Sequence, residues 1–351
     1  MAAKKAAKKA AKKTATRAAK SPQTAAKHVD ASRTVERQRD IQQQAGQAAK
    51  RAKKKAPAKK KAAQAGTRRQ PTNPTPEQHL AKPGNEHALD LQPRFLAPDY
   101  AGSGKLEGMV AIVTGGDSGI GRAVAVLFAR EGADVAVLHL AEDADAEETR
   151  GHVEAEGGRC LVIAGDVRDP EFCKSAVGKV AKAFGRLDVL VNNAAFQQHV
   201  ERLEDLTDEH LQETLQTNLA GYFHMARAAL PHMEEGASII NTGSETGIFG
   251  NPKLLDYSAT KGAIHAFTKS LASNLLGRGI RVNCVAPGPV WTPLNPADKA
   301  APDVADFGKD SDMGRPAQPE ELSPAYVFLA SPVMSSYVNG AILPVMGGPR
   351  G

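Results

Sequence analysis

Two side chains with complementary acid–base chemistry stand four residues apart in the chain. They are Tyr257 and Lys261, and Ser244 lies thirteen positions before the tyrosine. If this stretch is helical, positions i and i+4 share a face, so the lysine ammonium would lie beside the tyrosine phenol. A neighbouring positive charge lowers the pKa of a phenol from its reference value of about 10. The spacing therefore predicts a group that donates and accepts a proton near neutral pH.

Tyrosine and lysine at this spacing also occur on ordinary exposed helices, so the surrounding elements must decide between the two interpretations. From Leu106 onward, short apolar runs alternate with helix-like stretches. We expect strands at 109–113, 134–138, 161–164, 189–191, 238–241, 281–285 and 341–345, and helices near 119–131, 145–156, 170–184, 208–232, 257–277 and 319–331. This alternation predicts an α/β fold of the Rossmann type, a doubly wound sheet of seven parallel strands with helices on both faces.

A glycine-rich turn follows the first expected strand, where residues 114–122 read TGGDSGIGR. Glycines at 115, 119 and 121 allow a tight turn and the close approach of a pyrophosphate, which the N-terminus of the next helix would bind. An ordinary strand-to-helix turn is the alternative. The position of the turn in the first βαβ unit favours nucleotide binding.

Further motifs follow in a fixed order, and with them the chain resembles the short-chain dehydrogenase/reductase family over about residues 105–348. The motifs are Asp166-Val167 after the third expected strand, Asn192-Asn193-Ala194-Ala195 after the fourth, Asn218, Ser244, the Tyr257 and Lys261 pair, and the sequence PGPVWT at 287–292. The family usually has glycine at the position of Ala195, which adds one methyl group beside the cofactor. Motifs at 115–122, 255–261, 286–293 and 313–316 and the segment 102–108 are most similar to the bacterial branch of glucose/ribitol-dehydrogenase-like or general-stress oxidoreductases.

The resemblance implies an NAD(P)-dependent oxidoreductase that transfers a hydride between nicotinamide and a polyol, a sugar or a small aldehyde or ketone. Tyr257 would be the general acid/base, Ser244 would bind the reacting oxygen, Lys261 would also contact the nicotinamide ribose, and Asn218 would hold a water that joins Lys261 to solvent. The implied cofactor contacts are Gly115, Asp117, Ser118, Gly119, Ile120, Gly121, His139, Asp166, Val167, Asn193, Ala194, Tyr257, Lys261, Pro287, Gly288, Val290 and Thr292. The family's usual homotetramer is implied as well.

The choice between NAD and NADP depends on the end of the second expected strand. An acid there binds the ribose 2′-hydroxyl and repels a 2′-phosphate. The sequence has His139 at this place, and Arg122 lies farther along the helix. We therefore leave the cofactor as NAD or NADP and predict comparable activity with both.

The first fifth of the chain has a different composition from the rest. Residues 1–70 contain 22 Lys and Arg against 3 Asp and Glu, a net charge of +19, whereas the whole chain carries +6. Aromatic residues and leucine are absent from this segment, so we expect a disordered basic tail. Six prolines in 71–105 predict a linker or extended arm, and 106–351 is the expected dinucleotide-binding catalytic domain.

The tail allows several interpretations. Nonspecific binding of DNA, RNA or polyphosphate is favoured by its charge, and a solubilising extension, an acidic membrane surface or the acidic body of the same protein are the alternatives. The rival to an enzyme is a polyanion-binding protein whose dehydrogenase-like body is structural. No apolar run reaches the roughly 20 residues needed to span a membrane, so we expect a cytoplasmic protein, with the tail as a link to the nucleoid.

Other chemically active residues are given structural roles. The three cysteines are scattered, which predicts neither disulfides nor a zinc site. We expect packing or surface roles and no metal for His199, His210, His224, His232 and His265, and a solvated helix start for the acidic residues Glu142, Asp143, Asp145, Glu147 and Glu148. Trp291 either lines the substrate pocket or packs in the core.

Overall fold

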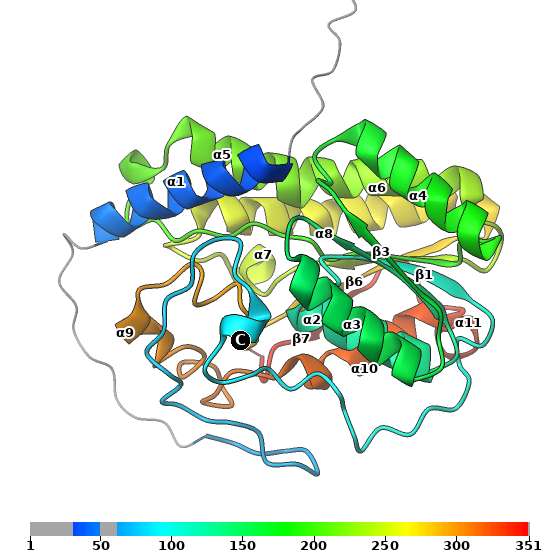
Figure 1. Ribbon diagram of the computed structural model, residues 1–351, viewed down its shortest axis with the longest axis horizontal. Helices are drawn as coiled ribbons and strands as arrows, with labels where there is room; N and C mark the ends of the chain where they lie inside the picture. Colours follow the sequence, from blue (N-terminus) through cyan, green and yellow to red (C-terminus); the bar gives the residue numbers. More distant parts are fainter. Residues whose placement is uncertain (1–30, 50–61, 350–351) are drawn as a thin grey trace, which may run out of the picture.

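Seven parallel strands rich in valine, isoleucine and leucine form the centre of the protein (Figure 1). The computed structural model describes residues 31–49 and 62–349 of the 351-residue chain. The strands are β1 (Val110–Thr114), β2 (Asp134–His139), β3 (Cys160–Ala164), β4 (Val189–Asn192), β5 (Ser238–Thr242), β6 (Arg281–Pro287) and β7 (Ile342–Val345). Their order in the sheet is β3-β2-β1-β4-β5-β6-β7. The predicted Rossmann-type fold is confirmed.

Helices cover both faces of the sheet (Figure 1). One face carries α4 (Pro170–Phe184), α5 (Asp208–Leu215), α6 (Gly221–Ala229) and α8 (Leu255–Leu275), and the other carries α2 (Gly119–Arg130), α3 (Asp143–Ala155), α10 (Ser323–Ala330) and α11 (Pro332–Ser335). The remaining helices are α1 (Ala31–Ala49), α7 (Thr246–Phe249) and α9 (Ala301–Val304). Because all strands are parallel, their carboxyl ends meet at one edge, where ligands bind in such folds.

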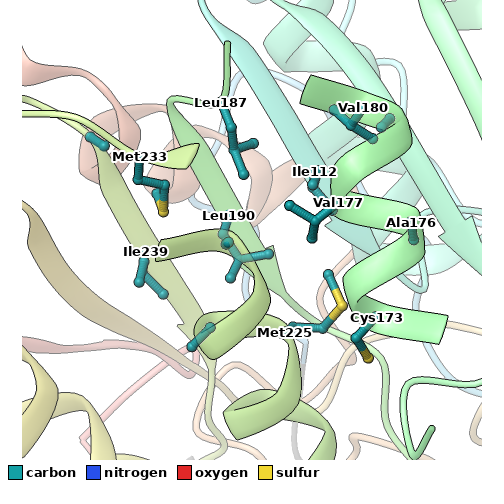
Figure 2. Packing of buried hydrophobic residues seen from close by; sticks show 14 of the residues in the cluster. Ile112, Cys173, Ala176, Val177, Val180, Leu187, Leu190, Met225, Met233 and Ile239 are labelled. Atoms are coloured by element: carbon teal, nitrogen blue, oxygen red, sulfur yellow. The ribbon is translucent and has the colours of Figure 1, made fainter. Parts of the chain in front are cut away.

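Two apolar layers hold the helices against the sheet. In the layer of Figure 2, Ile112, Leu190 and Ile239 from the strands pack against Val177 of α4 and Met225 of α6. Full burial of such a side chain contributes about 1.5–3 kcal/mol to folding. The packing fixes the strand ends and thereby the loops that follow them.

Two of the expected helices are interrupted. The stretch expected as one helix over 208–232 consists of α5, a π-helical turn (Gln216–Ala220), α6 and a 3₁₀ turn (Leu230–His232). The last expected helix begins with a 3₁₀ turn (Pro319–Glu321) before α10, whose first turn contains a second proline, Pro324. A π turn adds one residue to the helical repeat, which periodicity alone does not reveal, and such turns are frequent at functional sites.

Helix α1 corrects part of the prediction for the tail. Residues 31–49 were expected to be disordered, but they form a helix that lies along α5 (Figure 1). Its buried residues recur at helical spacing, since Val35, Gln38, Gln42 and Ala45 share one face, and Ile41 is only 2% exposed. Our prediction gave weight to the missing aromatic residues and overlooked this stripe. Residues 1–30 and 50–61 lie outside the described residues.

The proline-rich segment is an arm rather than a free linker. It has no regular element beyond a 3₁₀ turn (Glu86–Ala88), and backbone hydrogen bonds join Thr75 to Ala305 and Leu80 to Pro296 at 3.0 Å each. Trp291 anchors it, because the buried indole packs on Leu80 and Leu89 and donates to the Leu91 carbonyl at 2.8 Å. Trp291 therefore has the packing role. No helix within 31–49 or 62–349 is long and apolar enough to cross a membrane.

Candidate active site

The carboxyl ends of the strands open into one cleft that contains nearly every residue predicted to bind or react. Its lining includes Gly115, Asp117, Ser118, Gly119, Ile120, His139, Asp166, Val167, Asn193, Ala194, Ser244, Tyr257, Lys261, Pro287, Gly288, Val290 and Thr292. Gly121 and Asn218 do not line it. The fold thus brings together segments that lie up to 177 positions apart in the chain.

Tyr257 and Lys261 lie on the first two turns of α8, on the face turned towards the sheet. Both are buried, and the Lys261 ammonium donates to the Thr242 carbonyl at 2.8 Å. It lies 5.3 Å from the centre of the Tyr257 ring and 5.6 Å from that of Tyr222. The lysine is therefore held against the faces of two aromatic rings by the end of β5.

The pKa of the Tyr257 phenol differs from the predicted direction. Burial raises it well above its usual range, Asp298 and Glu245 add to that rise, and the hydrogen bond with Ser244 opposes it. The predicted lowering by Lys261 is not found, because the ammonium faces the ring and the Thr242 carbonyl. Burial also lowers the pKa of Lys261 to about 8.

Ser244 lies just after the carboxyl end of β5. Its hydroxyl accepts hydrogen bonds from the Thr246 backbone N–H at 3.1 Å and from the Thr246 hydroxyl at 3.0 Å, and it is hydrogen-bonded with the Tyr257 phenol. Two side-chain hydroxyls thus converge on one point of the cleft. A carbonyl or alcohol oxygen placed there meets both groups.

Asn218 lies in the π-helical turn behind this point and is fully buried. Its amide nitrogen donates to the Phe196 carbonyl at 2.8 Å, and its oxygen accepts from the Phe196 N–H at 2.7 Å. The side chain thus fixes the loop after β4. The predicted water between Asn218 and Lys261 stays a prediction.

The glycine-rich turn has the shape that a dinucleotide requires. Gly119 has a φ of +51°, and a side chain there would meet Thr292 at 2.9 Å. A Cβ at Gly121 would lie 1.9 Å from the Gly115 carbonyl oxygen, so Gly121 serves packing. The cleft therefore leaves backbone room for a pyrophosphate at the start of α2, and the residues present fit NAD or NADP.

The arm contributes a buried carboxylate to this turn. Glu86 accepts a hydrogen bond from the Gly119 N–H at 2.7 Å, and its other oxygen pairs with the Arg122 guanidinium at 3.0 Å. Burial raises the pKa of Glu86 to about 7, and Arg122 opposes the rise. The Arg122 guanidinium forms ion pairs with Glu86, Glu148 and Asp145, and Arg122 does not line the cleft.

At the end of β2 the cleft is lined by His139, Asp117 and Glu142. Glu142 and Asp145 are buried, which corrects our prediction of a solvated acidic cluster for these two residues. Asp145 accepts from the backbone of the arm at Glu86 and His87, because the arm covers the start of α3. Asp143, with 83% of its side chain exposed, is solvated as expected.

The adenine end of the cleft, defined by Asp166 and Val167, is covered by α1. The Thr34 hydroxyl donates to the Asp166 carboxylate at 2.6 Å, and Arg168 binds the same carboxylate at 2.7 Å. Gln38 donates to Glu213 at 3.1 Å, and both Thr34 and Gln38 line the cleft. Part of the basic tail therefore lies on the acidic body of the same chain, one of the partners considered for it.

The opposite, substrate end contains a buried charged group. Asp298 accepts from the His199 backbone at 2.6 Å and from its ring at 2.5 Å, and Lys299 contacts the other ring nitrogen at 3.1 Å. Lys82 of the arm donates to the Gln197 carbonyl, and burial lowers its pKa to about 8. His199 thus lines the cleft, whereas we predicted a packing or surface role for it.

Several residues that line the cleft were not expected there from the sequence. Four come from outside the family core and the fifth, Glu142, was expected to be solvated: Thr34, Gln38, Lys82, Gly84 and Glu142. The helical stripe of α1 was a usable signal for the first two. The remaining three lie in irregular segments, where no periodicity marks a side chain as buried. Among the described residues, no three His, Cys, Asp or Glu side chains are grouped to hold a metal.

Comparison with known proteins agrees with this geometry. The short-chain dehydrogenase model described as enoyl-(acyl carrier protein) reductase matches residues 115–349. The chain belongs to the short-chain dehydrogenase/reductase family. It is an oxidoreductase that uses NAD or NADP, and the resemblance stated from the sequence is confirmed.

Relatives in plants and bacteria cover the same part of this family member. General stress protein 39 of Bacillus subtilis is 51% identical, over 76% of this chain and 93% of the relative. Glucose and ribitol dehydrogenase of Daucus carota is 49% identical, and the chloroplastic NADPH-dependent aldehyde reductase 1 of Arabidopsis thaliana is 48% identical. Each of these two matches covers 78% of this chain and 96% of the relative.

Solved structures of short-chain dehydrogenases superpose on the same domain. One from Burkholderia cenocepacia in complex with NADP has a TM-score of 0.65 at 36% identity, and one from Mycobacterium paratuberculosis bound to NAD has 0.63 at 32%. Each match covers 70% of this chain and 98% of the other. The two cofactors both occur among the neighbours, so these comparisons leave the preference open.

Proposed function

We propose that the protein interconverts an alcohol and a carbonyl compound, with Tyr257 as general acid/base. The observation that supports this is the convergence of the Tyr257 and Ser244 hydroxyls at one point of the cleft, beside the Lys261 ammonium. Bound NAD or NADP would supply or accept the hydride. Asn218 takes part by positioning the Phe196 loop, and the cofactor would lie along the residues from Gly115 to Thr292 that line the cleft.

In the reducing direction the substrate oxygen gains negative charge as its carbon accepts the hydride. Ser244 would stabilise that charge with a hydrogen bond, and Tyr257 would donate the proton. The raised pKa of Tyr257 means that the phenol is protonated before the reaction. The Lys261 ammonium would contact the nicotinamide ribose, as the family resemblance implies.

The variant Tyr257→Phe tests this assignment. It keeps the ring and removes only the proton donor, so we expect turnover to fall about 10²–10⁴-fold while the Kd of NADH and NADPH is unchanged. The matched control is Tyr326→Phe, which removes another buried hydroxyl from a residue that does not line the cleft. This hydroxyl is hydrogen-bonded to the Thr242 hydroxyl at 2.8 Å. Full turnover by Tyr257→Phe would contradict the proposal.

We propose polyols, sugars and small aldehydes as the substrate class. The substrate end presents hydrogen-bonding groups from Gln197, His199, Asn251 and Lys299, which suit several hydroxyls. The names of the two plant relatives, glucose and ribitol dehydrogenase and aldehyde reductase, support the same range. Steady-state rates with matched polyols, sugars and aldehydes test the class, and activity confined to apolar ketones would contradict it.

We propose a homotetramer, as the family resemblance implies. Large apolar side chains, Phe223, Phe249, Val333 and Tyr337, are exposed on the described surface and would be covered by other copies. Light scattering after size exclusion measures the mass directly. A monomer at micromolar concentration would contradict this part of the proposal.

We propose a second activity for the basic residues outside the described structure. The charge contrast between residues 1–70 and the rest supports nonspecific binding of nucleic acid or polyphosphate, which would link a cytoplasmic enzyme to the nucleoid. This activity would be additional to catalysis, because the body retains the whole Ser244, Tyr257 and Lys261 set.

A further inference from the structure

Two buried carboxyl groups stand where the cofactor's adenosine ribose would lie. In this fold the ribose lies at the end of the second strand, here His139. Asp117 approaches from the glycine-rich turn and Glu142 from the start of α3, and both line the cleft beside His139. Their residues are only 6% and 8% exposed. The acid that the sequence lacks at the end of β2 is thus supplied twice from neighbouring elements.

A second observation indicates that this place receives a ligand. The His139 side chain is 1% exposed and lines the cleft, yet its Nδ1 has no hydrogen-bond partner in the described structure. An unsatisfied buried nitrogen costs free energy unless a ligand or water binds it. A ribose hydroxyl or a 2′-phosphate oxygen would supply that partner.

Charged groups from several elements surround Asp117 and Glu142. The surrounding groups are Asp145 and Asp143 of α3, Glu86 and His87 of the arm, His139 of β2 and Arg122 of α2, whose guanidinium pairs with Glu86. Burial and the Asp117 charge raise the pKa of Glu142 to about 8, and burial raises that of Asp117. The described residues that line the cleft include no arginine, and its lysines are Lys82, Lys261 and Lys299, away from β2.

We propose that Asp117 and Glu142 form a carboxyl pair that selects between NAD and NADP, and that the selection changes with pH through one shared proton. With the proton bound, the pair carries at most one negative charge and donates a hydrogen bond to a 2′-phosphate. Without it, the pair carries two charges, accepts hydrogen bonds from the ribose hydroxyls of NAD and repels the phosphate of NADP. Because the proton is lost as pH rises, NADP binding weakens relative to NAD binding towards alkaline pH.

This inference depends on the proposed function only in placing the dinucleotide in the cleft. The test measures cofactor binding directly, by fluorescence titration of the full-length protein with NADH and NADPH at pH 6.5, 7.5 and 8.5. For the unmodified protein we expect the ratio of the NADPH Kd to the NADH Kd to rise about tenfold across this range. This rise corresponds to about 1.4 kcal/mol of binding free energy. The 2′-phosphate also titrates near pH 6, so variants must separate its contribution from that of the protein.

Glu142→Gln provides that separation. It removes one charge of the pair and keeps an amide oxygen that accepts a hydrogen bond. We therefore expect the NADPH Kd at pH 8.5 to fall about tenfold, the NADH Kd to change by less than that, and the Kd ratio to become nearly independent of pH. Asp117→Asn should have the same effect on the pH dependence, and the double variant should remove no further pH dependence, because either change alone removes the shared proton. The matched control is Glu147→Gln, an exposed acid on the same helix that pairs with Arg150 and should keep the pH dependence.

The outcomes distinguish the two proposals. If Glu142→Gln and Asp117→Asn keep the pH dependence of the unmodified protein, the carboxyl pair does not select the cofactor and the inference is overturned. The same holds if Glu147→Gln has as large an effect, since any acid of α3 would then suffice. If the unmodified protein binds neither NADH nor NADPH, the proposed function fails and this inference fails with it.

Discussion

At the scale of single residues, the site depends on groups that position others as much as on groups that react. Asn218 shows this most clearly, because two of its hydrogen bonds hold the Phe196 backbone and a third joins its amide nitrogen to the Thr260 hydroxyl at 3.3 Å. The same loop continues to His199, which Asp298 holds in the substrate end. One buried amide thus stabilises a wall of the cleft from behind.

Asn218→Ala should therefore destabilise the protein as well as slow it. The change leaves the buried N–H and carbonyl of Phe196 without partners, at about 1–3 kcal/mol for each group. We expect the free energy of unfolding in urea to fall by about 2–4 kcal/mol and turnover to fall, with the Kd of NADH nearly unchanged because Asn218 is outside the cleft. Asn251→Ala, at a half-buried residue, would not alter stability comparably. An unchanged unfolding curve for Asn218→Ala would show that the loop is held by other contacts.

Sequence predicted which residues meet in the cleft, but it did not predict the electrostatics of Tyr257. The types and spacing of Tyr257 and Lys261 are local, so one helix suffices to predict that they share a face. The direction of the Tyr257 pKa is not local, because it depends on burial and on Asp298, 41 positions away. Desolvation of a side chain depends on the packed structure, so a short motif does not predict it.

At the scale of elements, α1 is the largest departure from the prediction and adds a wall to the cleft. The seven strands and the long helices of the family core were predicted, since their apolar periodicity is strong, whereas the four-residue helices α7, α9 and α11 were not. Helix α1 has a narrow stripe of Val35, Ile41 and Ala45 in a basic, alanine-rich segment, where composition argues against a core. Its contacts with Asp166 and Glu213 are made by polar side chains, which periodicity of hydrophobicity does not register.

Removing α1 should loosen cofactor binding. Deletion of residues 1–49 takes away Thr34 and Gln38 and exposes the adenine end to solvent, so we expect the NADH Kd to rise about threefold to tenfold, or by roughly 1 kcal/mol. Titration of NADH fluorescence measures this. Deletion of residues 1–30 is the matched control and should leave the Kd unchanged. Equal affinities of the two shortened proteins would mean that α1 does not contribute to binding.

At the scale of the whole molecule, the chain combines an acidic enzyme with a basic extension. The structure changes how the two must be separated. Removing residues 1–70 as a unit would also remove α1 and the contacts of Arg68 and Gln70 with Glu320, so altered kinetics would not report on the extension. The experiment can instead change residues 1–30 and 50–61, which lie outside the described residues and carry 17 of the 22 Lys and Arg of the tail.

A variant that lacks residues 1–30 and has glutamine at every Lys and Arg of 50–61 should lose DNA binding and keep its activity. Each phosphate contact contributes a slope of about −0.9 to log K against log salt, so the unmodified protein should bind duplex DNA with a steep slope, which the variant would lack. Filter binding between 50 and 300 mM salt measures the slope, and NADH oxidation measured on the same preparations shows that the body is intact. DNA retention by the variant with an unchanged slope would assign the binding to the rest of the chain, where the variant's net charge of −10 makes it least expected.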